Sequence, residues 1–112
     1  MRTIVTAAAI GAFYIAGAAL ADSITQPTSG EEFGTGIATV ACNGLSSYST
    51  GLTVKAKRDS DNVTVSSAVC DVQQPTWSAE LSRPSPQWDQ GLHYIRLYQL
   101  DVFQDEVGVT FN

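Results

Sequence analysis

The chain has 112 residues, and its six Lys and Arg against eleven Asp and Glu give a formal net charge of −5. A chain of this length has room for one small domain. Its acidic balance argues against nucleic acids and anionic membranes as partners, because binding to either requires clustered Lys and Arg side chains.

Residues 1–21 have the pattern of a secretory signal peptide. A short basic start containing Arg2 precedes 17 uncharged residues, 4–20, and small residues at Ala19 and Ala21 mark a cleavage site before Asp22. The alternative is a membrane anchor, but 17 residues are at the lower limit of a bilayer span and no Lys/Arg cluster follows. The sequence therefore predicts a secreted or periplasmic protein, with no stable membrane insertion after cleavage.

Cleavage would leave residues 22–112, in which five Lys and Arg face eleven Asp and Glu, a formal charge of −6. The one basic cluster is Lys55, Lys57 and Arg58. We interpret it as the solvated face and end of a strand, because Lys at outward or edge positions also blocks unwanted strand pairing.

Apolar residues in this region alternate with a period of two and include many Val, Thr, Ile and Tyr, whereas no segment has helical spacing. Extended segments are expected at 23–26, 37–42, 52–57, 63–72, 77–81, 93–100 and 107–111. Turn signals separate them: Asn43-Gly44, the polar stretch 58–62, Pro75, and a loop at 82–90 with two prolines. Seven short strands of this kind predict an all-β sandwich of two sheets.

Cys42 and Cys70 are the two cysteines of the chain. In an oxidising compartment a domain this small gains from a covalent cross-link, so we expect a disulfide between them. A reactive thiol pair and half of a metal site are the alternatives. Their spacing is far from Cys-x-x-Cys, and the single histidine, His93, cannot complete a tetrahedral site alone.

The run Gly91-Leu-His-Tyr-Ile-Arg-Leu-Tyr-Gln-Leu-Asp101 resembles the Gly-x-(His/Tyr)-x-Ile-x-Val-x-Ala-x-Asp run of bacterial immunoglobulin-like domains. Trp77-Ser78, placed 14 residues before Gly91, the ending Val-Thr-Phe at 109–111, and the opening Ile-Thr-Gln-Pro-Thr-Ser-Gly at 24–30 also match that family. The resemblance implies an immunoglobulin-like two-sheet sandwich of about seven antiparallel strands over residues 22–112.

Two departures from that family matter. Antibody-type domains place a Trp between the bridged cysteines, whereas Trp77 follows both here, so the bridge would join the second strand to a strand before Trp77. Such domains also usually occur in tandem or attached to an enzyme. A free-standing copy is expected to act by binding.

Alternation predicts which side chains of segment 93–100 could bind a partner. With His93, Ile95 and Leu97 turned to the core, Tyr94, Arg96 and Tyr98 project together from the opposite face. Tyr and Arg dominate protein-binding surfaces, and flat aromatic rings also stack on sugars. The alternative is that these tyrosines are ordinary strand residues. Trp88, in the proline-rich loop, extends that surface or caps the core.

Other polar residues are candidates for a metal site or a catalytic site. Two acidic groups could bind calcium, but no EF-hand pattern is present, and solvated turns in which Asp and Asn bond their own backbone are the favoured interpretation. No metal is therefore expected at these groups, which are Asp59, Asp61 and Asn62, and Asp101, Asp105 and Glu106. His93 could be a general base, but its position matches the corner aromatic of such sandwiches, whose polar tip bonds the backbone upstream. Trp77, in register with Ala79 and Leu81, is expected in the core.

The sequence thus predicts a secreted, non-catalytic binding module that recognises a protein or a glycan at the cell surface. No nucleophile, base and orienting group occur together, so neither enzymatic activity nor a cofactor is expected. The alternative function is that of a structural or assembly subunit whose copies associate through exposed strand edges.

Overall fold

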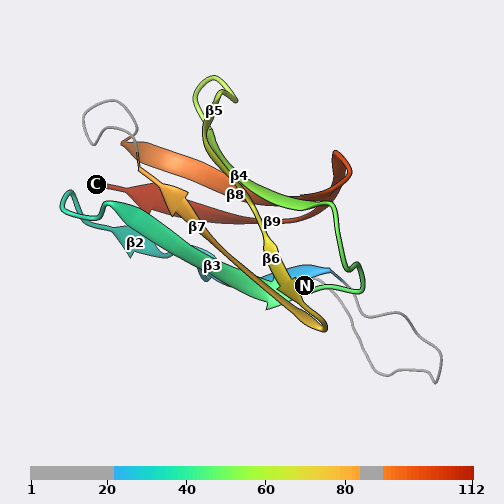
Figure 1. Ribbon diagram of the computed structural model, residues 1–112. Helices are drawn as coiled ribbons and strands as arrows, with labels where there is room; N and C mark the ends of the chain where they lie inside the picture. The colour runs from blue at the N-terminus through green and yellow to red at the C-terminus, as the bar shows by residue number, and fades with distance from the viewer. Residues whose placement is uncertain (1–21, 84–89) are drawn as a thin grey trace.

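The computed structural model describes residues 22–83 and 90–112, which form two β-sheets packed face to face (Figure 1). One sheet has the order β1 (Ser23–Gln26), β3 (Thr39–Leu45), β7 (Thr76–Ser82), β6 (Asp71–Gln73). The other has the order β2 (Glu32–Phe33), β9 (Val102–Phe111), β8 (Gly91–Gln99), β4 (Leu52–Arg58), β5 (Thr64–Val69).

This strand order is that of an immunoglobulin-like sandwich. In the spatial order of each sheet, β1, β3, β7 and β6 correspond to strands A, B, E and D of one immunoglobulin sheet, and β9, β8 and β4 to strands G, F and C of the other. β5 adds a further strand beside β4. The predicted all-β, immunoglobulin-like fold is therefore confirmed.

The described residues contain nine strands where about seven were predicted. One addition is β2, which pairs with the end of β9 in parallel, so the sandwich is not wholly antiparallel. The other arises because segment 63–72 is not one strand. Cys70 donates its N–H to the carbonyl of Leu52 in one sheet, and Asp71 then pairs with Ser78 in the other. The chain changes sheets at this point.

The core lies between the sheets and is built by alternation on β3, β4, β7, β8 and β9. Its largest fully buried side chains include Trp77, Leu52, Leu81, Ile95 and Leu97. Trp77 is 1% exposed, which confirms its predicted place in the core. Burying apolar side chains from both sheets in one layer is the main stabilising contribution in a fold of this kind.

The Asn43-Gly44 turn predicted at the end of the second strand is wrong, because β3 continues through both residues to Leu45. Gly44 pairs with Trp77 on β7, and a Cβ at position 44 would overlap the carbonyl oxygen of Ser23. That carbonyl accepts a hydrogen bond of 3.1 Å from the Trp77 indole nitrogen. Glycine is needed here for close backbone approach, not for a turn.

The predicted disulfide between Cys42 and Cys70 is not present in the structure, where both are buried free thiols. Cys42 lies opposite Ala79 on β7, and Asp71, next to Cys70, lies opposite Ser78 on the same strand. β7 thus separates the two cysteines. Strands two places apart lie about 9.6 Å from each other, beyond the Cα separation of about 7 Å that a disulfide spans.

Burial raises the pKa of the Cys42 thiol to about 12, with a smaller contribution from Cys70, and raises that of Cys70 to about 11. Both thiols are therefore protonated at neutral pH, which makes them poor nucleophiles and poor metal ligands.

Within residues 22–83 and 90–112, no helix has the length and apolar character needed to cross a bilayer. The predicted signal peptide, residues 1–21, lies outside the described residues.

Candidate functional site

The predicted binding residues Tyr94, Arg96 and Tyr98 lie on the outer face of the five-stranded sheet. In β8 they alternate with His93, Ile95 and Leu97, whose side chains are completely buried. All three outward side chains are partly exposed. The predicted orientation is confirmed, while Trp88 lies outside the described residues.

Strand register places further side chains beside these three, in rows that cross β5, β4, β8 and β9. The first row is Val69, Thr53, Tyr98 and Phe103; the second is Ser67, Lys55, Arg96 and Glu106; the third is Thr64, Lys57, Tyr94 and Gly108. We call these twelve residues the outer-face site. Sequence reasoning identified only the β8 members, because the pairing of strands is not visible in a single segment.

Cations and aromatic rings alternate across the site. The Lys55 ammonium lies 5.1 Å from the centre of the Tyr98 ring, and the Arg96 guanidinium lies 5.5 Å from that of Tyr94. The Tyr98 ring meets Phe103 edge to face, with ring centres 6.3 Å apart. These contacts hold the side chains in defined positions on the sheet surface.

Arg96 is further fixed by an ion pair, in which its Nε donates to Glu106 at 2.9 Å. A longer hydrogen bond of 3.4 Å joins its guanidinium to the Asn62 side chain in the β4–β5 turn. Partial burial acts to lower the pKa of Arg96, but hydrogen bonds to Glu106 and Tyr98 outweigh it and raise that pKa. The guanidinium is thus a permanent, oriented charge.

Large apolar side chains are exposed at one end of the site and on the adjoining β8–β9 turn. Val69 is 80% exposed and Phe103 52%; Leu100 in the turn is 72% exposed, and Val102, the first residue of β9, is 61% exposed. Leu100 and Asp101 both have positive φ, the conformation of a two-residue hairpin turn usually made by Asn and Gly. Leucine is unusual in this conformation, and here it leaves its apolar side chain exposed at the hairpin tip.

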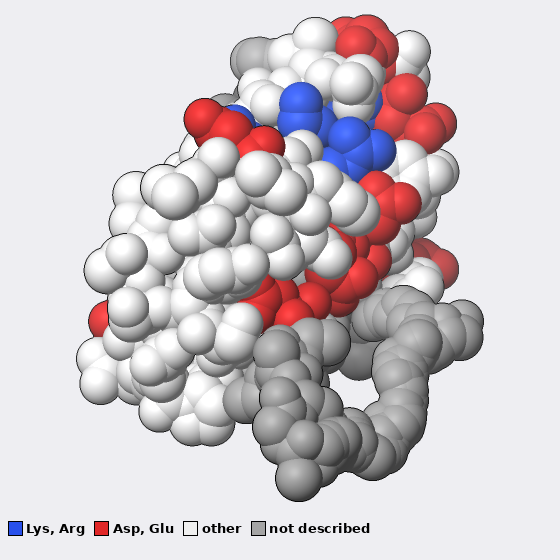
Figure 2. All heavy atoms as spheres, turned by 90° about the vertical axis from the view of Figure 1, so that its right-hand side faces the viewer, with Lys and Arg blue, Asp and Glu red and all other residues white. Residues whose placement is uncertain are grey.

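Basic residues concentrate on this side of the molecule. Figure 2 shows Lys and Arg side chains together in the upper part of the molecule, with acidic side chains above, beside and below them. Four of the five Lys and Arg after residue 21 belong to β4 or β8; they are Lys55, Lys57, Arg58 and Arg96. The outer-face site is thus a basic area on an acidic chain.

The candidate calcium ligands are engaged in structural contacts. Asp61 accepts two hydrogen bonds from Arg58, whose guanidinium lowers the pKa of that carboxyl, and Asp105 accepts one from the N–H of Ile24. Glu106 pairs with Arg96. In the part of the chain that the structure describes, no group of three His, Cys, Asp or Glu could hold a metal ion.

His93 occupies the structural position expected of a corner aromatic. It is completely buried, its Nδ1 lies 3.0 Å from the carbonyl of Gly91 two residues upstream, and its ring meets Phe111 edge to face. Because a carbonyl only accepts, Nδ1 carries the proton. Nε2 is buried without a hydrogen-bond partner, so no substrate reaches it from solvent.

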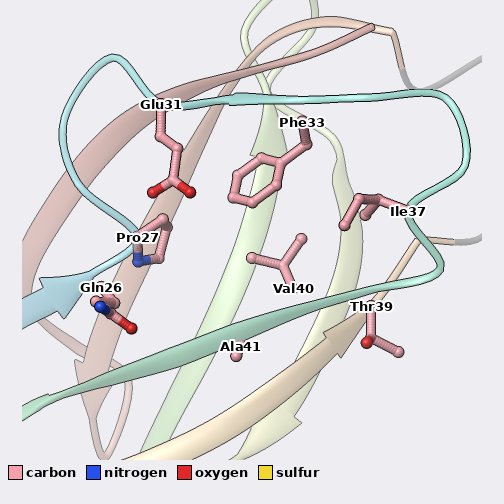
Figure 3. Close-up of a pocket in the computed structure, with 8 residues that line it drawn as sticks. All are labelled: Gln26, Pro27, Glu31, Phe33, Ile37, Thr39, Val40 and Ala41. Carbon is pink, nitrogen blue, oxygen red and sulfur yellow. The ribbon is translucent and has the colours of Figure 1, made fainter.

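A second candidate is a pocket of about 300 Å³ between β2 and β3, drawn in Figure 3. Phe33, Ile37 and Val40 supply its apolar wall. Its carboxylate, Glu31, already accepts hydrogen bonds from the N–H and hydroxyl of Thr28. With no Lys, Arg, His or Cys among the residues that line it, the pocket offers less for recognition than the outer-face site.

No family model matches this sequence, and no curated protein matches it. A similar solved structure, the monoclinic form of the ZIG-8–RIG-5 IG1–IG1 heterodimer, has 11% identity and a TM-score of 0.43, and the match covers 78% of this chain and 84% of that one. The twitchin kinase region from C. elegans has 15% identity and a TM-score of 0.39. That match covers 82% of this chain and 15% of the twitchin chain. The fold assignment therefore rests on the strand order above.

Proposed function

We propose that this chain is a secreted, non-catalytic interaction module that recognises a protein at the cell surface through its outer-face site. The observation that carries the proposal is the end of that site where large apolar side chains are more than half exposed, at Val69 and Phe103, with Leu100 on the adjoining turn and Val102 at the start of β9. Exposed apolar groups that gather in one area are typical of interaction surfaces.

The neighbouring side chains are of the type that anchors protein interfaces. Tyr and Arg are enriched among the residues that dominate binding energy, and Tyr98 and Arg96 lie beside the apolar end. Because Lys55 and Glu106 already hold them in place, little side-chain entropy is lost when a partner binds.

A protein is favoured over a glycan by the aliphatic members of this area. Val69, Leu100 and Val102 gain free energy by leaving water against an apolar surface, at about 25 cal/mol per Å². A sugar ring stacks on Tyr94 and Tyr98 but gives these aliphatic groups little to pack against. A glycan therefore remains the alternative ligand that the experiment below must distinguish.

The absence of catalysis is part of the proposal. Its support is that His93, the one histidine, is completely buried and that Cys42 and Cys70 are buried, protonated thiols. An accessible base or nucleophile would have to come from other residue types.

Export is supported by the pattern of residues 1–21. The released protein is expected to begin at Asp22, as measured by mass spectrometry of material from the medium or periplasm. An intact Met1 would contradict cleavage and favour an anchored form.

Site-specific photo-crosslinking tests the binding site. A benzophenone amino acid replaces Phe103 in one protein and Glu80, exposed on β7 of the other sheet, in a matched control. Each is irradiated on intact cells that produce the chain. We expect a discrete crosslinked protein from position 103 and none from position 80, with the product lost when Tyr98→Ser is added.

Equal products from both positions would contradict the proposed site. If position 103 gives no protein product while the unmodified chain binds a glycan array, and Tyr94→Ser with Tyr98→Ser abolishes that binding, the protein partner is wrong and the glycan alternative is correct.

A further inference from the structure

We propose that a second copy of this chain pairs with β5, in antiparallel orientation about a two-fold axis at Ala68, so that two five-stranded sheets become one. The proposal uses Val69, which also belongs to the outer-face site, but it is tested on the chain alone, without the partner proposed for that site. It rests on the composition of the β5 edge, on the backbone groups that this edge leaves open, and on the exposure of Val69.

β5 is the strand least protected against pairing among the described residues. It lies at the end of its sheet and pairs only with β4. Its sequence, Thr-Val-Ser-Ser-Ala-Val, contains no charge, proline or glycine. The other described strands at sheet ends are β1, four residues long and followed by Pro27, β2 with two residues, and β6, which begins with Asp71. Short, charged or proline-terminated edges resist strand addition, and β5 has none of these features.

The register identifies which backbone groups of β5 are open. Cys70 donates its N–H to the carbonyl of Leu52, so these two residues form a hydrogen-bonded pair of the β4–β5 ladder. Such pairs alternate along antiparallel strands, so Ala68 also turns its N–H and C=O toward β4. The N–H and C=O groups of Ser67 and Val69 point away from β4, toward the edge.

A two-fold axis at Ala68 matches these open groups to each other. Ser67 of one copy then lies opposite Val69 of the second, and the two symmetric pairs supply about four backbone hydrogen bonds. This register avoids the bulge between Ala56 and Lys57, which disturbs the first part of β5. An isologous contact of this kind closes on itself and gives a dimer, not a fibre.

The same register covers the most exposed apolar side chain among the large ones described, Val69 at 80%. Val69 of one copy becomes the diagonal neighbour of Val69 of the second, at a Cα distance of about 7–8 Å, within reach of side-chain contact. The β4–β5 hairpin projects beyond the rest of the sandwich at the top of Figure 1.

Charge explains why a second copy is able to use this edge and few others. Residues 22–112 carry a formal charge of −6, so most contacts between copies bring like charges together. β5 itself is uncharged, and in the adjoining turn Arg58 is paired with Asp61 at 2.9 Å. The strand itself therefore brings no like charges together, and the nearest carboxylates are those of Asp71 and Glu80, which line a pocket with Val69.

Analytical ultracentrifugation of the mature protein tests the proposal across about 10 µM to 1 mM, the range suited to an edge contact of small area. We expect a monomer–dimer equilibrium whose dissociation constant rises at least about tenfold in Val69→Lys, because two lysines then meet at the axis. Leu92→Lys, an equal charge change at an exposed apolar residue of β8, is the matched control and should change it less than about twofold.

Hydrogen exchange gives a second, residue-specific readout. The amides of Ser67 and Val69 should become more protected as concentration rises, whereas the amide of Ala68, bonded to β4, should not change with concentration. A monomer throughout the range with no such protection would overturn the proposal, as would equal weakening by both lysine variants. A different protein isolated on β5 would also overturn it. Both readouts use the purified chain without any partner, which separates this test from that of the proposed function.

Discussion

The two ends of the five-stranded sheet are built in opposite ways. At the β2 end, the edge strand has only two residues, and hydrogen bonds from Thr110 to Glu31 and from Asn112 to Phe33 join it to the end of β9. At the β5 end, the open groups of Ser67 and Val69 are not paired with any described strand. One end is closed by a strand too short to add a partner, and the other ends in a six-residue strand left for pairing.

Arg83 secures the closed end. Its side chain is 8% exposed and donates to the carbonyls of Gly34 at 2.8 Å and Asn112 at 2.6 Å. Its guanidinium lies 4.9 Å from the centre of the Phe111 ring, on which Phe33 also stacks. A buried cation that satisfies two carbonyls costs desolvation but fixes two strand ends in place.

This contrast shows that the ends of two strands can be held together by a residue that is distant from both in the sequence. Arg83 belongs to neither β2 nor β9, yet it joins the ends of both. The β5 end has Lys55 and Lys57 on the neighbouring strand but no charge on the edge itself. Protection by lysine requires the lysine to be on the edge strand.

The largest effect is expected at Trp77, which is buried in the core between the two sheets. Trp77→Ala should cost about 3–5 kcal/mol of folding free energy, a large share of the total for a small domain. Chemical denaturation measures the loss, and hydrogen exchange should show both ends opening together. If only one end opens, the β2 and β5 ends belong to separate cooperative units, and the core does not stabilise them together.

The second prediction concerns the closed end. Arg83→Ala should cost about 2–3 kcal/mol, because hydrogen bonds from a charged group to two carbonyls are lost. Val69→Ala at the open end should change stability by no more than about 0.5 kcal/mol. Urea denaturation of both variants at low concentration makes the comparison direct.

Arg83→Lys is the control for the charge. It keeps the cation but lacks the planar fork that reaches both carbonyls, so its stability should lie between those of the parent and Arg83→Ala. Equal losses in Arg83→Ala and Val69→Ala would show that the two ends are held with the same strength.

The third prediction concerns the cysteines, of which Cys70 directly follows the open strand. A thiol whose pKa is raised from 9.0 to about 12 when folded stabilises the protein fully below pH 9, and this contribution is lost as the pH rises toward 12. Stability of the parent should therefore fall more steeply above pH 9 than that of Cys42→Ala with Cys70→Ala. Thermal melting of both proteins from pH 8 to pH 11 measures the difference.

A thiol assay supplies the control for this prediction. Protein unfolded without reductant should show two free thiols. If it shows none, the cysteines are bridged in solution, and the pH dependence assigned to them must have another source.

Sequence patterns predicted what depends on one segment at a time. Alternation in segment 93–100 placed Tyr94, Arg96 and Tyr98 on one face and His93 inside, and both placements are confirmed. The same logic placed Trp77 in the core. Each of these depends on strand periodicity alone, which is encoded locally.

The features that could not be predicted depend on how strands pair. Lys55 reaches Tyr98, and Phe103 joins the same row, because of registers fixed by the whole sheet. The change of sheets at Cys70 likewise depends on a hydrogen bond to Leu52, 18 positions earlier in the sequence. That change, together with β7 lying between the cysteines, is also why the expected disulfide is not present.

The smallest effect on stability is expected at the outer-face tyrosines. Tyr94→Ser with Tyr98→Ser removes contacts to Arg96, Lys55 and Phe103 but no core packing, so it should cost about 1 kcal/mol or less. If these rings anchor the partner, the same change should weaken binding by about 2 kcal/mol. Thermal melting gives the first quantity, and crosslinking yield from position 103 against concentration gives the second.

Leu92→Ser is the matched control, because it removes an exposed apolar side chain from the same strand outside the outer-face site. It should leave both stability and crosslinking close to those of the parent. If the double tyrosine variant unfolds, the rings are structural supports of the sheet. If it stays folded and crosslinks as well as the parent, recognition lies elsewhere, and the open end of the sheet becomes the more important of the two surfaces.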